Sequence, residues 1–169
     1  MDLRDAIRDI PDFPEKGILF RDITPILQDG KLLREAVDQL DALAQKYDFD
    51  IIAGPESRGF IFGVPLAYKL GKGFIPIRKA GKLPYETIKK SYALEYGTAT
   101  IEMHTDAIKP GTKVLIIDDL LATGGTASAI VDMMEEVGAE VAASVFLIEL
   151  SALNGREKIK GNIEALIKY

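Results

Sequence analysis

Runs of mainly apolar residues alternate along this chain with segments of helical spacing. The runs are rich in β-branched residues and predict buried strands, at residues 50–54, 74–77, 114–117, 141–150 and 163–167. Helices are expected between and around them, at residues 2–9, 31–47, 59–70, 126–137 and 151–158. Strands that alternate with helices favour an α/β fold, in which a parallel β-sheet is flanked by helices on both faces.

Length and composition narrow the class of protein. A chain of 169 residues is expected to form a single domain, residues 1–169, and its 47% hydrophobic and 28% charged residues are ordinary values for a globular protein. The net charge of −5 argues against nucleic-acid binding through a basic surface, and the absence of cysteine excludes disulfides and thiolate chemistry. No apolar run approaches the ~20 residues of a membrane span, and no signal-peptide pattern is visible. We expect a cytoplasmic protein without membrane or nucleic-acid partners.

The most informative stretch is residues 114–126, where a buried strand runs into Asp118 and Asp119, then into a loop of small residues and a helix. Open α/β sheets bind ligands at the carboxyl ends of their strands. Residues 123–126 can direct several backbone N–H groups toward one phosphate, and the two carboxylates suit a neighbouring cis-diol. The stretch therefore predicts a site for a ribose 5-phosphate. In a simpler interpretation the acids only end a strand and Thr126 only caps a helix.

Two further groups of charged residues follow predicted strands. After residues 50–54 come Glu56, Ser57 and Arg58, and after residues 74–77 come Arg78, Lys79 and Lys82. Both strands should end at the same edge of the sheet, so both groups are candidates for anion contacts, with Arg78 foremost in the second. The alternatives are that Ser57 is a plain helix N-cap and that the basic cluster is a solvated surface.

Residues 114–126 resemble the phosphoribosyl-pyrophosphate (PRPP) signature of type I phosphoribosyltransferases. In that family the two acids hold the ribose hydroxyls and the loop holds the 5′-phosphate. The resemblance implies these roles for Asp118 and Asp119 and for the loop, which comprises Ala122, Thr123, Gly124, Gly125 and Thr126. It also implies the type I phosphoribosyltransferase fold.

The segment at residues 55–59 is similar to the family's pyrophosphate loop, which often contains a cis peptide bond. The resemblance therefore implies pyrophosphate contacts from Glu56, Ser57, Arg58, Arg78, Lys79 and Lys82. It further implies a homodimer, and in some relatives the partner chain supplies the segment that corresponds to Arg78.

Residues 13–25 resemble a stretch of the adenine branch of the family, F-P-x-x-G-[IV]-x-F-x-D-I-[ST]-P. That stretch belongs to a small N-terminal hood over the base, here mainly residues 1–27. The resemblance implies that backbone groups of Leu19 and Arg21 pair with adenine and that Phe20 lines its pocket. Considered locally, the same residues predict a strand at 18–20 and an N-capped turn within a covering loop.

Residues 81–103 predict a hairpin or mobile flap with few core-forming residues. Their S-Y-A-L-E-Y-G segment, which contains Glu95 and Tyr96, is similar to the flexible catalytic loop of the adenine branch. His104 follows on a polar stretch and is expected at the surface.

The resemblance implies a purine salvage enzyme that converts adenine and PRPP into AMP and pyrophosphate. It implies Mg²⁺ that is bound mainly through PRPP and water, without a direct protein ligand. Charge that develops on the leaving pyrophosphate would be stabilised by Arg58 and Arg78. Many purine-salvage relatives have an acid where this chain has Ala122, so we expect Glu95 to handle the proton at N7 of the base, unless it is only a solvated flap residue.

Two other functions are consistent with parts of this pattern. One is a phosphoribosyltransferase for a 6-oxopurine or for orotate, which the hood sequence and Ala122 disfavour. The other is a non-enzymatic regulator that senses PRPP. Such regulators usually carry an additional DNA-binding region, whereas this chain is short and acidic.

Overall fold

The computed structural model describes residues 2–94 and 96–169, which form two compact units, Met1–Gln39 and Leu40–Tyr169. The first unit contains α1 (Leu3–Ala6), β1 (Arg8–Ile10), β2 (Phe20–Asp22), α2 (Thr24–Gln28) and the start of α3 (Gly30–Ala44). β1 and β2 pair as an antiparallel ribbon, with Ile10 opposite Phe20. The helix expected over residues 2–9 was wrong in extent: it lasts one turn, because the chain from Arg8 onward pairs with β2 instead.

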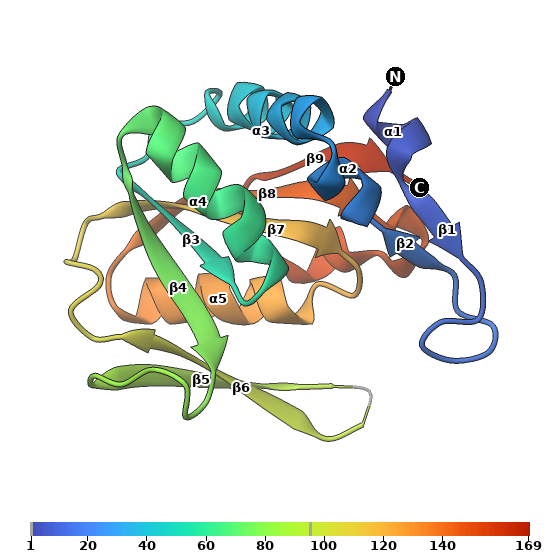
Figure 1. Ribbon diagram of the computed structural model, residues 1–169. Helices are drawn as coiled ribbons and strands as arrows, with labels where there is room; N and C mark the ends of the chain where they lie inside the picture. Colours follow the sequence, from blue (N-terminus) through green and yellow to red (C-terminus); the bar gives the residue numbers. More distant parts are fainter. Residues whose placement is uncertain (1, 95) are drawn as a thin grey trace. The chain divides into compact units, whose positions relative to one another are not determined.

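The second unit is built on a seven-stranded sheet with the order β5-β6-β4-β3-β7-β8-β9 (Figure 1). Its elements are β3 (Ile51–Pro55), α4 (Arg58–Leu70), β4 (Gly73–Lys79), β5 (Thr87–Ala93), β6 (Thr98–His104), β7 (Lys113–Leu121), α5 (Gly125–Glu136), β8 (Glu140–Glu149), the 3₁₀ turns η1 (Ser151–Leu153) and η2 (Gly155–Lys158), and β9 (Ile163–Lys168). The predicted strands and the α/β fold are thus confirmed.

The five strands β4, β3, β7, β8 and β9 are parallel, and the β5–β6 hairpin joins the sheet antiparallel to β4. The connection from β3 runs through α4 to β4, and the connection from β7 runs through α5 to β8 on the other side. Because such crossovers are right-handed, α4 covers one face of the sheet and α5 the other (Figure 1). The strand order therefore reverses between β3 and β7, which is where sheets of this kind leave a crevice at their carboxyl edge.

The core of the second unit follows from the apolar runs. Ile116 of β7 and Phe146 of β8 pack against Ile130 and Met134 of α5, and all four side chains are buried. Apolar positions on α5 repeat at helical spacing, so one side of the helix is buried while Glu135 and Glu136 lie at the exposed end. This packing fixes where the carboxyl end of β7 and the start of α5 lie.

Three expectations from the sequence differ from the structure in detail. The predicted hairpin exists, but it has core content, because Ile101 and Met103 of β6 are buried in the apolar cluster beneath α5. His104 is only half exposed, and its Nε2 accepts a hydrogen bond from the Tyr85 N–H at 3.3 Å. The helix expected over residues 151–158 is two 3₁₀ turns, because Asn154 between them adopts a left-handed conformation, with φ of 53°.

Among the described residues, no helix has both the length and the apolar character that a membrane crossing requires.

Candidate functional site

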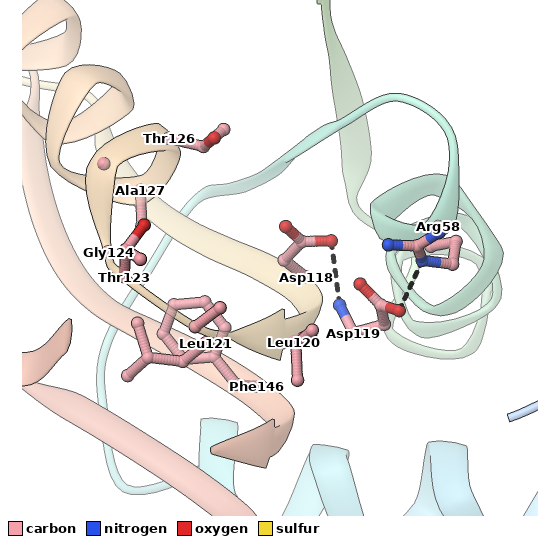
Figure 2. Close-up of a pocket in the computed structure, with 12 residues that line it drawn as sticks. Arg58, Asp118, Asp119, Leu120, Leu121, Thr123, Gly124, Thr126, Ala127 and Phe146 are labelled. Atoms are coloured by element: carbon pink, nitrogen blue, oxygen red, sulfur yellow. Dashed lines mark hydrogen bonds and ion pairs between the residues drawn. The ribbon is translucent and has the colours of Figure 1, made fainter. Parts of the chain in front are cut away.

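The ends of β3 and β7 meet at the point where the strand order reverses, and a cavity of about 210 Å³ opens there (Figure 2). Residues from the end of β7, from the following loop and from the first turn of α5 surround it, together with Arg58 at the start of α4. The cavity thus brings together the two predicted acids and the predicted phosphate loop, Asp118, Asp119, Ala122, Thr123, Gly124, Gly125 and Thr126.

The two acids differ in their surroundings. Asp119 is buried, and its Oδ2 accepts a hydrogen bond from Arg58 Nε at 2.6 Å (Figure 2). Asp118 Oδ1 accepts the backbone N–H of Asp119 at 2.8 Å. Burial and the adjacent Asp119 carboxylate raise the pKa of Asp118 well above its usual value, although Arg58 opposes this shift. A pair of this kind can accept hydrogen bonds from two neighbouring hydroxyl groups.

The conformation of the phosphate loop requires glycine at position 124, both for its backbone angle and for its contact with Gly155. Gly124 is the N-cap of α5 with φ of 85°, a conformation that a residue with a side chain rarely adopts. A Cβ at this position would also lie 2.4 Å from the carbonyl oxygen of Gly155, and a Cβ at Gly155 would lie 2.4 Å from the Ala122 carbonyl oxygen. The backbone of the phosphate loop and the backbone at Gly155 are therefore in direct contact, with no space for a side chain between them. At Gly125, by contrast, a Cβ would make an ordinary contact of 3.5 Å with the Tyr92 ring.

The segment beneath the loop is held in place by an ion pair. Arg156 follows Gly155 and donates to both carboxylate oxygens of Glu149 at 2.8 Å, from Nε and from Nη2. Its Nη1 donates to the carbonyl oxygen of Ile163 at 3.0 Å. Hydrogen bonds from Arg156 lower the pKa of Glu149, although burial opposes the shift. These contacts connect the last residue of β8 and the first residue of β9 to the backbone that supports the phosphate loop.

A second cavity, of about 410 Å³, shares Arg58, Asp118, Asp119 and Thr126 with the first and extends to Glu56, Ser57 and Lys79. The peptide bond between Glu56 and Ser57 is cis, as the resemblance had implied. Ser57 occupies the N-cap position of α4, but its side chain makes no capping hydrogen bond to the described residues of the helix.

The predicted basic residues gather around Glu56. Its Oε1 accepts the Lys79 N–H at 2.6 Å, and its Oε2 lies 2.7 Å from Lys82 Nζ and 3.4 Å from Arg78 Nη2. Burial works against the charged form of Glu56, but the donors from Lys82, Lys79 and Arg78 outweigh it and lower its pKa from 4.5 to about 2. The group predicted as anion contacts is therefore already paired with an internal carboxylate.

Several predicted residues are not among those that line these cavities. Leu19, Phe20 and Arg21 belong to the first unit, where Arg21 Nη1 lies 2.5 Å from Asp9 Oδ1. Tyr96, near the tip of the β5–β6 hairpin, is 88% exposed. Glu95 lies outside the described residues, so its predicted role stays a prediction.

The structure adds residues that the sequence patterns did not single out. Pro55 lines the second cavity, and Leu120, Leu121, Ala127 and Phe146 line the first. The hydroxyl of Tyr92 lies 2.9 Å from Thr126 Oγ1. Leu121 and Ala127 adjoin the predicted loop and could have been included by proximity. Phe146 and Gly155 come from distant segments and give no local signal. Tyr92 lies in the S-Y-A-L-E-Y-G segment, but nothing in that pattern relates it to Thr126.

Among residues 2–94 and 96–169, no group of three or more His, Cys, Asp or Glu side chains is arranged to hold a metal ion. The carboxylates at hand are Asp118 and Asp119, and Glu56 is engaged by cations. This donor set fits a hard cation such as Mg²⁺ only if substrate oxygens and water complete its coordination.

Comparison with known proteins gives consistent results over the whole chain. The phosphoribosyl transferase domain matches residues 23–164. The adenine phosphoribosyltransferase of Lachnoclostridium phytofermentans is 61% identical over 99% of this chain and 97% of its own length. The crystal structure of the enzyme of that name from Thermoanaerobacter pseudethanolicus superposes with a TM-score of 0.96 at 51% identity, covering 99% of this chain and 98% of that one.

The adenine phosphoribosyltransferase of Saccharomyces cerevisiae, solved with adenine and an imino-altritol bisphosphate, has a TM-score of 0.92 at 41% identity, over 97% of this chain and 96% of that one. Relatives of this similarity, matched along nearly their full length, share more than a common architecture. The chain therefore belongs to the phosphoribosyltransferase family, and within it to the adenine phosphoribosyltransferases.

Proposed function

We propose that this protein transfers the 5-phosphoribosyl group from PRPP to adenine and releases AMP and pyrophosphate. The observation that carries the proposal is the crevice between β3 and β7, where two adjacent carboxylates lie beside a glycine loop at a helix N-terminus. The family to which the chain belongs supports the same reaction. The site and the relatives thus support the same function, which is a reaction of purine salvage.

In this proposal Asp118 and Asp119 accept hydrogen bonds from the 2′- and 3′-hydroxyls of the ribose. The backbone N–H groups of residues 123–126 and the hydroxyl of Thr126 bind the 5′-phosphate at the start of α5, where the helix dipole favours an anion. A ribose 5-phosphate has these two groups at opposite ends of one small molecule. The first cavity offers both kinds of partner along its lining.

Pyrophosphate would lie in the second cavity, which adjoins the first through Arg58 and the two aspartates. Arg58 keeps its Nη groups for a phosphate while its Nε holds Asp119, so it links the two halves of PRPP. Ser57 and Lys79 line the same cavity. Lys82 and Arg78 contact Glu56, which also lines it. The buried Nε of Arg78 has no acceptor within the described chain, which supports an acceptor from pyrophosphate or from the second chain of a homodimer.

The base would be bound by the hood, mainly residues 1–27, with Leu19, Phe20 and Arg21 at the adenine and residues 81–103 as the flap. Adenine presents an exocyclic donor where hypoxanthine presents an acceptor. Fixed backbone partners can therefore discriminate between the two bases, because the wrong base leaves a buried polar group unpaired. Glu95 would assist proton movement at N7, a task for which Ala122 has no suitable group.

Mg²⁺ bound to PRPP would screen the negative charge of the leaving pyrophosphate. The chain itself would orient the ribose through Asp118 and Asp119 and stabilise the departing anion through Arg58. A location in the cytoplasm remains a prediction from the sequence.

The direct test is to mix the purified protein with Mg²⁺, PRPP and one of adenine, hypoxanthine, guanine or orotate, and to measure nucleotide formation. We expect AMP from adenine and a preference over the other bases by a factor of up to ~10⁴. Comparable turnover of hypoxanthine or guanine would contradict the choice of substrate. Absence of any nucleotide with all four bases would contradict the reaction itself.

A further inference from the structure

Thr126 contacts a residue that the proposed reaction does not use. The hydroxyl oxygen of Tyr92 lies 2.9 Å from Thr126 Oγ1. The ring of Tyr92 lies against Gly125, since a Cβ built on that glycine would meet its Cδ2 at 3.5 Å and its Cε2 at 3.7 Å. Tyr92 therefore covers the first turn of α5 with both its ring and its hydroxyl group.

The position of Tyr92 is fixed by the strand to which it belongs. Along β5 the side chains alternate, so that Ile88 and Tyr92 pack against the core beneath α5 while Ser91 faces solvent. Lys90, on the same side as Tyr92, forms an ion pair with Glu136 near the other end of α5. A ring that is already packed in this way loses little further freedom when its hydroxyl makes a hydrogen bond.

The hydroxyl groups allow one arrangement when a phosphate is bound. A threonine hydroxyl has one hydrogen and can accept as well as donate. If that hydrogen goes to a phosphate oxygen, the Thr126 oxygen can only accept from Tyr92, so the phenol must be the donor. Donation into the Thr126 oxygen polarises its O–H bond and strengthens the bond to the anion.

We propose that Tyr92 is a positioning residue for the 5′-phosphate of the nucleotide, acting through Thr126. It fixes the rotamer of the Thr126 side chain and directs the threonine hydrogen toward the loop. The inference rests on the function proposed for the loop and extends it to a residue on the β5–β6 hairpin. It explains why a strand far from the loop in sequence contributes a phenol to the first turn of α5.

The test compares a ligand that has the phosphate with one that lacks it. Dissociation constants of AMP and of adenosine are measured by calorimetry for the wild type, for Tyr92→Phe and for Tyr47→Phe. Tyr92→Phe keeps the ring and removes the hydroxyl, and we expect it to weaken AMP binding about threefold to tenfold, the usual effect of one hydrogen bond. Adenosine binding should be unchanged, because adenosine has no phosphate.

Tyr47→Phe is the matched control. It also removes one phenol hydroxyl, which donates to Glu164 Oε1 at 2.8 Å and lines neither cavity, and it should leave both constants unchanged. A general loosening of the hairpin would weaken AMP and adenosine alike in Tyr92→Phe, and that result would overturn the proposal. Unchanged AMP binding would overturn it as well.

A second measurement establishes the route through Thr126. In a Thr126→Val background, Tyr92→Phe should have no additional effect on the affinity for AMP, because the group through which it acts is gone. An undiminished effect in that background would overturn the proposal. Failure of the wild type to bind AMP would instead contradict the proposed function, which separates the two conclusions.

Discussion

Replacement of Glu56 by glutamine tests whether the basic cluster at the end of β4 is stabilised by this internal carboxylate. The donors around Glu56 lower its pKa from 4.5 to about 2. This difference of about 2.5 pKa units corresponds to at most about 4 kcal/mol at roughly 1.4 kcal/mol per pKa unit. The side chains of Arg78 and Lys82 are 36% and 45% exposed, so solvent screens part of this interaction. We therefore expect Glu56→Gln to lower the free energy of unfolding by about 1–2 kcal/mol at pH 7.

The dependence on pH distinguishes this interaction from a loss of packing. The pKa of Glu56 is lower in the folded than in the unfolded chain, so its stabilisation is complete above the unfolded value of 4.5 and is lost as the pH falls toward about 2. Urea unfolding of the wild type and the variant should give a difference that is constant from pH 7 to about 5.5 and shrinks at pH 3.5. Glu86→Gln, at an exposed position, is the control. A difference that is absent at pH 7, or that stays constant down to pH 3.5, would refute the reasoning.

Three further outcomes are expected at the proposed site. Asp118→Asn and Asp119→Asn should each lower kcat/KM for PRPP tenfold or more without unfolding the chain, since each removes a charge-assisted hydrogen bond worth about 1.5–3 kcal/mol; wild-type kinetics would remove these acids from the site. Gly124→Ala should abolish AMP binding in calorimetry while Gly125→Ala retains it, and equal binding by both would contradict the backbone contact described for Gly124. Glu95→Ala should reduce single-turnover kcat by about 10²–10⁴ with AMP affinity and Tm nearly unchanged; a variant that keeps half of the wild-type rate would show that the base needs no carboxylate there.

The sheet and the first cavity could be predicted because their signals are local. The β-branched run before Asp118 predicts a buried strand. A glycine-containing loop before a helical pattern, here Thr123–Gly124, predicts an anion site because backbone N–H groups are exposed at a helix N-terminus. The acids, the loop and Arg58 therefore lie together as expected.

Features that depend on partners distant in sequence could not be predicted in the same way. Ile101 and Met103 are core residues only because β6 pairs with β4 and lies beneath α5, whereas the sequence alone predicts a flap with few core residues. The pairing of Glu56 with Lys82 and the contact of Tyr92 with Thr126 arise from the tertiary fold alone. A sequence pattern records which groups are present, whereas these contacts depend on where the sheet brings them.

The packing of Gly124 against Gly155 has a consequence for protein engineering. Transplanting residues 114–126 into another parallel sheet would transfer the acids and the glycines but not the surface on which the loop rests. A recipient whose backbone carries a side chain beneath the graft would push the loop outward, and its N–H groups would no longer converge. A working transplant would also need the segment around Gly155 and the Arg156–Glu149 ion pair that holds it. The smallest part of this protein that could be transplanted as a phosphate site therefore comprises two separate stretches of chain.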